Sequence, residues 1–426
     1  MTPIASVIIP THNRCYTLGR TLAALEQQTY PTQQFEVVVV ADGCTDGTLD
    51  MLGRYQPPFA LQALELPGRG PAEARNCGAA QAQGRLLIFL DDDVEATPAL
   101  IETHVQAHAG APGRVVIGYL PPVVQEPASI FGLQLHHWWE AMFQRMRQPG
   151  HRYGYWDLLG GNLSLAAELF ARVGGFDPTL RCHEDYELGI RLIAAGASLT
   201  FAADAAGYHH ETTGLDRSLR RKYHEGRADV IIGGRHPALC PSMPLAYYDE
   251  PWSPTSRRLR ALAFAWPIGG DILVAGLRRV LDLLEWMRLH GRWRRLLNVL
   301  LDYWYWRGVA EELGKQKTSA ATRRLADFLH QSALQHNEEP CEIELDLREG
   351  LEVAEQRLDA ARPAGAAVRY GQHVVGHIAP KPGAEQLRST HLRPILATDL
   401  AWPLLKALAL EAVSGDGPAW GIQRLQ

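Results

Sequence analysis

The sequence has no apolar run long enough to cross a bilayer, since nowhere do about 18 uninterrupted apolar residues follow one another. The nearest candidate, residues 261–280, is interrupted by Pro267, Asp271, glycines and two arginines. The start of the chain also lacks the basic residues, apolar stretch and small-residue cleavage site of a secretory signal. We therefore expect a cytoplasmic protein, with peripheral contact at the inner face of a membrane left open.

Cysteine is scarce, and no sign of charge dominates. The six cysteines, at positions 15, 44, 77, 182, 240 and 341, form no Cys-x-x-Cys pair and no spacing suited to a closed zinc site. Buried thiols in a reducing compartment are the simple interpretation. The net charge of -5 gives no basic field, which excludes a protein that mainly wraps nucleic acid.

Three familiar nucleotide and hydrolase signatures are missing. Gly68-x-Gly70 precedes a helical pattern, but Glu73 stands where a dinucleotide fingerprint has its third glycine. There is no Walker loop and no Gly-x-Ser-x-Gly elbow. Any nucleotide site must be built in another way.

Apolar strands alternate with helices in the first 95 residues. Short apolar runs predict strands, and intervening segments with helical spacing predict helices. The expected strands are 6–10, 35–40, 61–66 and 86–90, and the expected helices begin near 18, 49 and 72. Strands of this kind form parallel sheets covered on both faces, and ligands collect at their carboxyl ends.

The rest of the chain changes character twice. Mixed loops and strands with a helix over 183–195 are followed by helices rich in arginine and tryptophan from about 256 to 330. After a polar joint, a strand (342–347), a helix (351–361), a pair of strands around Gly371 and a final helix predict a small α+β module. At 426 residues and 46% apolar the chain can hold several cores, and we expect domains at 1–235, 236–335 and 336–426.

The acidic triplet Asp91-Asp92-Asp93 directly follows an expected strand. One aspartate could cap a helix, but three adjacent carboxylates repel one another unless a cation offsets the repulsion. Hard oxygen ligands suit Mg²⁺ or Mn²⁺, so the triplet predicts a divalent-cation site.

Other polar residues fall at similar places. Asp42, at the end of the second strand, could accept hydrogen bonds from a nucleoside or could belong to an ordinary Asp-Gly turn. Glu184 and Asp185 begin a helix, where they either favour its dipole or provide a general base. His209 and His210 could supply an imidazole to the cation or be ordinary strand-end residues.

Six segments in order resemble the family 2 glycosyltransferases of the GT-A fold. They span about 220 residues: Val7 to Arg14, Val39 to Thr48, Ala74 to Gly78, Phe89 to Asp93, Gly160-Gly161-Asn162 and His183-Glu184-Asp185. The chain departs from the family where Ala41-Asp42 replaces two aspartates and Cys44 replaces a serine. The resemblance implies a Rossmann-like mixed sheet with helices on both faces, followed by the helical region and the α+β module.

The resemblance also implies residue roles. Asp185 would be the base beside Glu184, while Asp91, Asp93 and His209, preferred to His210, would hold Mn²⁺ or Mg²⁺. The donor, a UDP- or GDP-linked sugar, would meet Pro10, Thr11, Asn13, Arg14, Asp42, Arg75, Asp91, Asp92, Gly161 and Asn162. Within that set, Arg75 is expected near the base and Asp91 near the ribose.

The implied reaction is metal-dependent inverting transfer to a hydroxyl of a glycan, a lipid-linked or another acceptor, in cell-surface polysaccharide, glycolipid or other glycoconjugate synthesis. The alternatives are a nucleotidyltransferase, although residues 11–14 contain no glycine for a phosphate loop, and a non-catalytic sugar-nucleotide-binding module. Residues 256–310 are either a solvated helical face or a peripheral membrane contact.

Overall fold

The computed structural model of the chain describes residues 2–111, 113–123, 129–210, 213–314, 321–335 and 341–414. It divides into two compact units. The first unit contains residues 1–143 and 155–337, and the second contains residues 144–154 and 338–426. The second unit is thus built from two stretches that lie far apart in the sequence.

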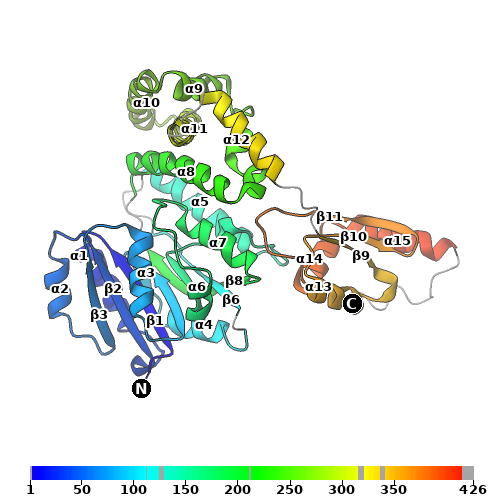
Figure 1. The fold of residues 1–426 in the computed structure, drawn as a ribbon, viewed down its shortest axis with the longest axis horizontal. Helices are drawn as coiled ribbons and strands as arrows, with labels where there is room; N and C mark the ends of the chain where they lie inside the picture. The colour runs from blue at the N-terminus through cyan, green and yellow to red at the C-terminus, as the bar shows by residue number, and fades with distance from the viewer. Residues whose placement is uncertain are drawn as a thin grey trace. The chain divides into compact units, whose positions relative to one another are not determined.

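A large mixed sheet forms the centre of the first unit (Figure 1). Its strands within the described residues are β1 (Ala5–Thr11), β2 (Phe35–Asp42), β3 (Ala60–Leu66), β4 (Leu86–Leu90), β5 (Val94–Ala96), β6 (Arg114–Tyr119), β7 (Asn162–Ala166) and β8 (Ser198–His209). The strand order is β3-β2-β1-β4-β7-β6-β8-β5. β3, β2, β1 and β4 run parallel, whereas β7 runs antiparallel to β4 and β6, and β5 antiparallel to β8. The mixed sheet expected from the resemblance is confirmed.

Seven helices of the described residues accompany this sheet. They are α1 (Cys15–Leu25), α2 (Thr48–Arg54), α3 (Pro71–Gln81), α4 (Leu100–Ala107), α5 (Ile130–Met146), α6 (Ala167–Arg172) and α7 (Glu184–Ala194). The sequence places α3 closely on the sheet because Gly78 has no side chain, and a Cβ there would lie 2.5 Å from Cγ2 of Ile8. Every residue of β2 is buried, as its run of valines predicts.

The helical region belongs to the first unit. Its helices are α8 (Leu215–Arg235), α9 (Pro254–Ala265), α10 (Pro267–Trp286), α11 (His290–Gly314) and α12 (Ala321–Gln335). Trp293, Tyr303 and Trp306 are fully buried in their common core. Within the described residues, no helix has the length and apolar character needed to span a membrane. These helices and the sheet form one compact unit. The expected division of the chain into domains at 1–235, 236–335 and 336–426 stays a prediction.

The second unit contains a three-stranded sheet within the described residues, in the order β11-β10-β9. Its elements are β9 (Glu342–Asp346), α13 (Leu351–Ala361), β10 (Gly365–Tyr370), β11 (His373–Ile378), α14 (Ser389–Ala397) and α15 (Ala401–Ser414). The expected strand pair around Gly371 is confirmed, but the single final helix is wrong. The chain leaves helical geometry at Thr398 (φ -116°, ψ -82°), which separates α14 from α15.

Residues 144–154 join this second unit through backbone acceptors. Arg152 donates from Nε to the carbonyl of Glu385 (2.6 Å) and from Nη2 to the carbonyl of Ala364 (2.8 Å). Gly154 pairs with Ala384 in an antiparallel bridge. This insertion could not be predicted from local sequence patterns, because the partners of Arg152 lie more than 200 residues away along the chain.

Candidate active site

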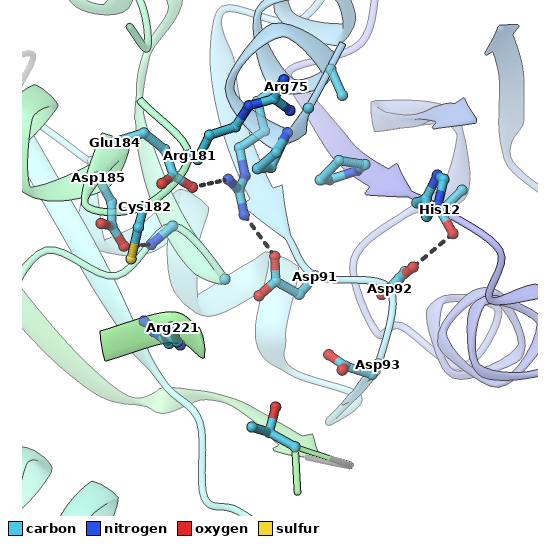
Figure 2. A pocket seen from close by; sticks show the side chains of 18 of the residues that line it. His12, Arg75, Asp91, Asp92, Asp93, Arg181, Cys182, Glu184, Asp185 and Arg221 are labelled. Atoms are coloured by element: carbon cyan, nitrogen blue, oxygen red, sulfur yellow. Dashed lines mark hydrogen bonds and ion pairs between the residues drawn. The ribbon is translucent and has the colours of Figure 1, made fainter. Parts of the chain in front are cut away.

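A cavity of about 720 Å³ opens at the carboxyl ends of β1, β2 and β4 (Figure 2). Most of the predicted site residues line it. They are Pro10, Thr11, Arg14, Asp42, Arg75, Asp91, Asp92, Asp93, Gly161, Glu184, Asp185 and His209. Seven separate segments of the sequence therefore meet around one space, as ligand sites in such sheets do.

Asp91, Asp93 and His209 offer ligand atoms that all lie within 4.8 Å of one another. The short strand β5 explains this arrangement. It begins immediately after Asp93 and pairs with β8 so that Val94 stands opposite His209. The N–H of His210 also donates to the carbonyl of Asp93 (2.9 Å), which fixes the end of β8 beside the triplet.

The chemistry of this cluster fits a divalent cation. Oδ1 of Asp93 is buried and receives no hydrogen bond of regular geometry from the described residues, although Nε2 of His209 lies 3.3 Å away. Burial opposes ionisation of Asp93, but His209 and Arg14 outweigh it and lower the pKa of this carboxyl. An ionised carboxylate pair with an imidazole is a donor set for Mn²⁺ or Mg²⁺. His210 instead bonds Oε2 of Glu95 through Nε2 (2.8 Å).

Asp92, to which the sequence assigned only a place in the donor site, anchors the loop after β1. Its Oδ2 accepts from Oγ1 of Thr11 (2.6 Å) and its Oδ1 accepts from Nη1 of Arg14 (3.0 Å). The same Arg14 nitrogen donates to Oδ2 of Asp93 (2.5 Å). Burial raises the pKa of Asp92 to about 6, against the lowering effect of Arg14 and Thr11. Asp92 thus positions Thr11 and Arg14 at the cavity wall.

Arg75 on α3 bridges two carboxylates. Nη2 donates to Oδ1 of Asp91 (2.9 Å) and Nη1 donates to Oε1 of Glu184 (3.0 Å). Its guanidinium carbon lies 5.5 Å from the centroid of the Phe176 ring. Burial, together with the charge of Asp185, raises the pKa of Glu184, while Arg75 opposes that rise. The resemblance implies that Arg75 lies near a nucleobase; in the structure it forms hydrogen bonds with Asp91 and Glu184.

Asp185 lies in the first turn of α7 and lines the cavity. Its Oδ2 accepts from the N–H of Gly160 (3.2 Å), and its Oδ1 accepts from the N–H of Tyr186 (2.9 Å). Since both bonds come from backbone, the carboxylate has a fixed direction and keeps further lone pairs. Figure 2 shows Asp185 beside Glu184 and Cys182, apart from Asp91.

His183, which precedes this pair, has a left-handed backbone (φ 59°, ψ 21°). Such a conformation is costly for a residue with a side chain and persists where its surroundings enforce it. Here Nδ1 donates to Oδ1 of Asp229 on α8 (2.9 Å), and Tyr305 on α11 donates its hydroxyl to Oδ2 of the same carboxylate (2.7 Å). Burial alone would lower the pKa of His183, but Asp229 raises it. The helical region therefore helps to hold the start of α7.

Two predicted donor residues lie outside the cavity lining. Asn162 is fully buried, where its Oδ1 lies 2.8 Å from Nε2 of His104 and its Nδ2 donates to the carbonyl of Ala205 (2.9 Å). Asn13 (φ 54°) uses its Oδ1 to accept from the N–H groups of Thr45 (2.7 Å) and Asp46 (3.2 Å). Both amides bind other parts of the chain and neither lines the cavity, so their expected contact with the donor stays a prediction.

Asp42 lines the cavity, yet its carboxylate holds a neighbouring loop. Oδ1 accepts from the N–H groups of Gly68 (2.9 Å) and Arg69 (2.7 Å), and Oδ2 accepts from that of Gly70 (2.6 Å). From the sequence, Asp42 was expected either to contact a nucleoside or to belong to an ordinary Asp-Gly turn. Neither alternative included the hydrogen bonds that its carboxylate accepts from residues 68–70. The carboxylate shapes this loop at the edge of the cavity.

The sequence did not identify a basic wall of the cavity. Its residues are Arg181, Arg217, Arg220, Arg221 and His224. The last four have the spacing i, i+3, i+4, i+7, which places side chains on one face of a helix. That spacing was a usable signal, but the helix that carries it, α8, was not predicted.

The fold and these segments together define a GT-A glycosyltransferase domain. The solved structure of mannosyltransferase PcManGT from Pyrobaculum calidifontis, in complex with GDP-Man and Mn²⁺, aligns with a TM-score of 0.50 at 20% identity. The alignment covers 74% of this chain and 89% of that one. Residues 6–174 match the family model described as glycosyl transferase family 2, and residues 140–213 match the N-terminal domain of galactosyltransferase. Residues 6–174 are thus similar to glycosyl transferase family 2, and the fold of the first unit is that of the GT-A glycosyltransferases.

Curated relatives agree with this family. A validoxylamine A glucosyltransferase from Streptomyces hygroscopicus subsp. jinggangensis is 34% identical over 277 residues, which cover 57% of this chain and 63% of that protein. Glycosyltransferase AglE from Haloferax volcanii is 28% identical over 232 residues, covering 54% of this chain and 74% of that protein. The chain spans about three fifths of the length of the validoxylamine A glucosyltransferases, at 63% and 58%.

Proposed function

We propose that this protein is a divalent-cation-dependent, inverting glycosyltransferase that moves a sugar from a nucleoside-diphosphate donor to an acceptor hydroxyl. One observation carries the proposal: Asp91, Asp93 and His209 converge in the same cavity as the carboxylate of Asp185. The names of the relatives support a sugar transfer, and PcManGT is named with GDP-Man and Mn²⁺.

The residues divide the work by position. The nucleoside side is formed by Thr11 and by the loop that Asp42 holds. A bound cation would neutralise the negative charge that grows on the departing diphosphate. Asp185 takes the proton of the acceptor hydroxyl. At the same time the acceptor oxygen forms a bond to the anomeric carbon of the donor sugar, and the bond between that carbon and the diphosphate breaks. Arg75 keeps Glu184 paired, whereas Asp185 binds only backbone N–H groups and keeps lone pairs for the proton of the acceptor.

The donor set favours Mn²⁺ over Mg²⁺, because His209 contributes nitrogen and Mg²⁺ is bound chiefly by oxygen. UDP- and GDP-linked sugars are the donors to test first. The transfer would be that of a hexose or related sugar in polysaccharide, glycolipid or other glycoconjugate synthesis.

The test separates cation binding from proton transfer. We expect Asp185→Asn to fold and bind nucleoside diphosphate with Mn²⁺ as wild type does, while release of nucleoside diphosphate from the donor falls about 10²- to 10⁴-fold. Asp93→Asn should lose Mn²⁺-dependent binding itself, as should wild type in EDTA. Donor turnover and calorimetric titration measure these effects for UDP-glucose, UDP-N-acetylglucosamine and GDP-mannose.

Asp50→Asn is the matched control, since Asp50 is exposed on α2 away from the cavity lining. It should change neither binding nor turnover. Near-normal turnover by Asp185→Asn, or turnover that persists in EDTA, would contradict the proposal.

We also propose peripheral contact with an anionic membrane, where a lipid-linked acceptor would be met at the cytoplasmic face. α10 exposes large apolar side chains along its length, with Ile272 70% and Trp286 80% exposed, and Trp266, which directly precedes it, is 63% exposed. Exposed arginines follow it at positions 288, 292, 294 and 295. An apolar surface beside basic residues suits the interface of a bilayer containing anionic lipid.

Vesicle flotation tests this contact. Wild type should float with vesicles containing phosphatidylserine, less so with phosphatidylcholine alone or at high salt, because the electrostatic part is screened. Ile272→Ser with Trp286→Ser should abolish flotation. Trp402→Ser on α15 is the control, since Trp402 is 81% exposed outside this surface. Absence of wild-type flotation at every salt concentration would exclude the contact.

A further inference from the structure

The first three turns of α8 present a basic face to the cavity, which we call the arginine face. It consists of Arg217, Arg220, Arg221 and His224, and Arg181 adds a fifth basic side chain from the segment before α7.

Much of this positive charge has no counter-charge. Arg221 approaches Oε1 of Glu225 (3.4 Å), a carboxylate that also pairs with Lys222 (2.5 Å). Arg217 and Arg220 are exposed to the cavity and form no ion pair with any described residue. By contrast, Arg14 and Arg75, which also line the cavity, each pair with two carboxylates. Unpaired guanidinium groups in a cavity repel one another until an anion enters.

The arginine face lies beside the proposed base. Figure 2 shows Arg221 on the same side of the cavity as Cys182 and Asp185, with His12 and Asp92 across the space. Burial and then the positive charges of Arg227 and Arg181 lower the pKa of His224, which places Arg181 within electrostatic reach of α8. The face therefore adjoins the part of the cavity where an acceptor hydroxyl must lie.

Position separates this face from the proposed cation site. Figure 2 shows Arg221 on the side of Asp185, with Asp93 across the space. Arg217 and Arg220, which form no ion pair with any described residue, can therefore bind a second anionic group. Guanidinium groups bind phosphate and carboxylate through paired hydrogen bonds.

We propose that the acceptor is anionic, and that Arg217 and Arg220 bind a phosphate or carboxylate group near its reactive hydroxyl. This inference rests on the proposed function but goes beyond it, because it assigns the chemical class of the acceptor. It makes the arginine face an acceptor site, distinct from the site of the donor diphosphate.

The experiment uses the full chain loaded with saturating UDP or GDP, whichever binds, and Mn²⁺, so that the donor diphosphate site is filled. Glycerol 3-phosphate is the anionic probe and glycerol the neutral one. We expect titration of the loaded protein to show binding of glycerol 3-phosphate, weakening with salt, and none of glycerol. The double variant Arg217→Ala, Arg220→Ala should weaken that binding at least about tenfold, the equivalent of about 1.4 kcal/mol, and leave the affinity for the nucleotide within about twofold.

Arg257→Ala with Arg258→Ala is the matched control, because both residues are exposed on α9 and neither lines the cavity. It should bind both ligands as wild type does. The inference is overturned if loaded wild type does not bind glycerol 3-phosphate, if the double variant binds it equally well, or if the variant loses nucleotide affinity in parallel. If the protein binds nucleotide but the double variant binds glycerol 3-phosphate as wild type does, the anionic acceptor is contradicted and the proposed function is not. If the protein binds no nucleotide at all, the proposed function is contradicted as well.

Discussion

At Gly161 the missing side chain determines where Asp91 can lie. The two residues meet because β4 and β7 pair up to Leu90 and Asn162, and the carbonyl of Gly161 accepts from the N–H of Asp91 (3.0 Å). A Cβ at Gly161 would stand 2.5 Å from Oδ2 of Asp91, closer than atoms tolerate. The position of this proposed cation ligand thus depends on a glycine in the neighbouring strand.

We therefore expect Gly161→Ala to reduce Mn²⁺-dependent donor turnover at least about tenfold, because the carboxylate must move and small misplacements of reacting groups are costly. The apparent Mn²⁺ affinity should fall with it, as measured by turnover across a Mn²⁺ titration. Gly19→Ala is the control, since a Cβ on this residue of α1 meets nothing within 4 Å. If Gly161→Ala leaves the dependence of turnover on Mn²⁺ unchanged, Asp91 is not a ligand of the cation.

The sequence placed several single residues at one edge of the sheet or at a helix start. Asp91 and Asp93, after a strand, and Asp185, at the start of a helix, line one cavity, and their roles stay predictions. The partners of Asn13 and Asn162 could not be predicted, because an amide both donates and accepts and its partners depend on tertiary contacts.

Among the elements, the three-residue strand β5 shows what periodicity cannot reveal. Three residues are too few to establish an alternation, yet the pairing of β5 with β8 brings His209 to Asp93. The early strands and helices were predictable because each has a clear apolar pattern. The helix α8 escaped notice since its first half is rich in arginine and its apolar face becomes evident only against α11.

The crossing of α8 and α11 is close because each helix contributes a glycine. A Cβ at Gly226 would overlap the carbonyl oxygen of Tyr305, and one at Gly308 would overlap that of Tyr223. The same crossing carries the bonds from Asp229 to His183 and Tyr305. Separation of these helices should therefore disturb both the core and the start of α7.

Gly226→Ala and Gly308→Ala should each lower the free energy of unfolding by about 1–3 kcal/mol, as overpacking does. Urea unfolding measures this change, and donor turnover should fall in the folded variants because Asp185 follows His183. Gly276→Ala provides the contrast, since nothing lies within 4 Å of a Cβ at that exposed position of α10. It should raise stability by about 0.5–1 kcal/mol, as a helical alanine in place of glycine does. Equal effects at all three glycines would contradict the close crossing.

In the molecule as a whole, one chain builds two compact units and crosses between them more than once. The sequence predicted the strands and first helix of the second unit from local patterns alone. It could not predict the contribution of residues 144–154, because Arg152 and Tyr153 find their partners only after the chain has returned near Ala364 and Glu385. A single boundary such as residue 336 cannot describe a unit that also contains residues 144–154.

The insertion predicts how a shortened chain behaves. Without residues 338–426, Arg152 loses its carbonyl acceptors at Ala364 and Glu385, and Tyr153 loses the N–H of Glu385 that its carbonyl accepts (2.8 Å). Backbone that loses such partners opens more often, and proteases cut the open state. Trypsin should therefore cleave after Arg147 and Arg152 at least about tenfold faster in a chain that ends at residue 337 than in the full chain.

Mass spectrometry of the fragments over time measures those rates, and cleavage after Arg54 at the end of α2 in the first unit serves as the internal reference. That rate should be the same in both chains if the first unit keeps its fold without the second. Equal protection of residues 144–154 in both chains would show that this segment holds its conformation without the second unit. A rise at Arg54 as well would instead show that the first unit needs the second for its own stability.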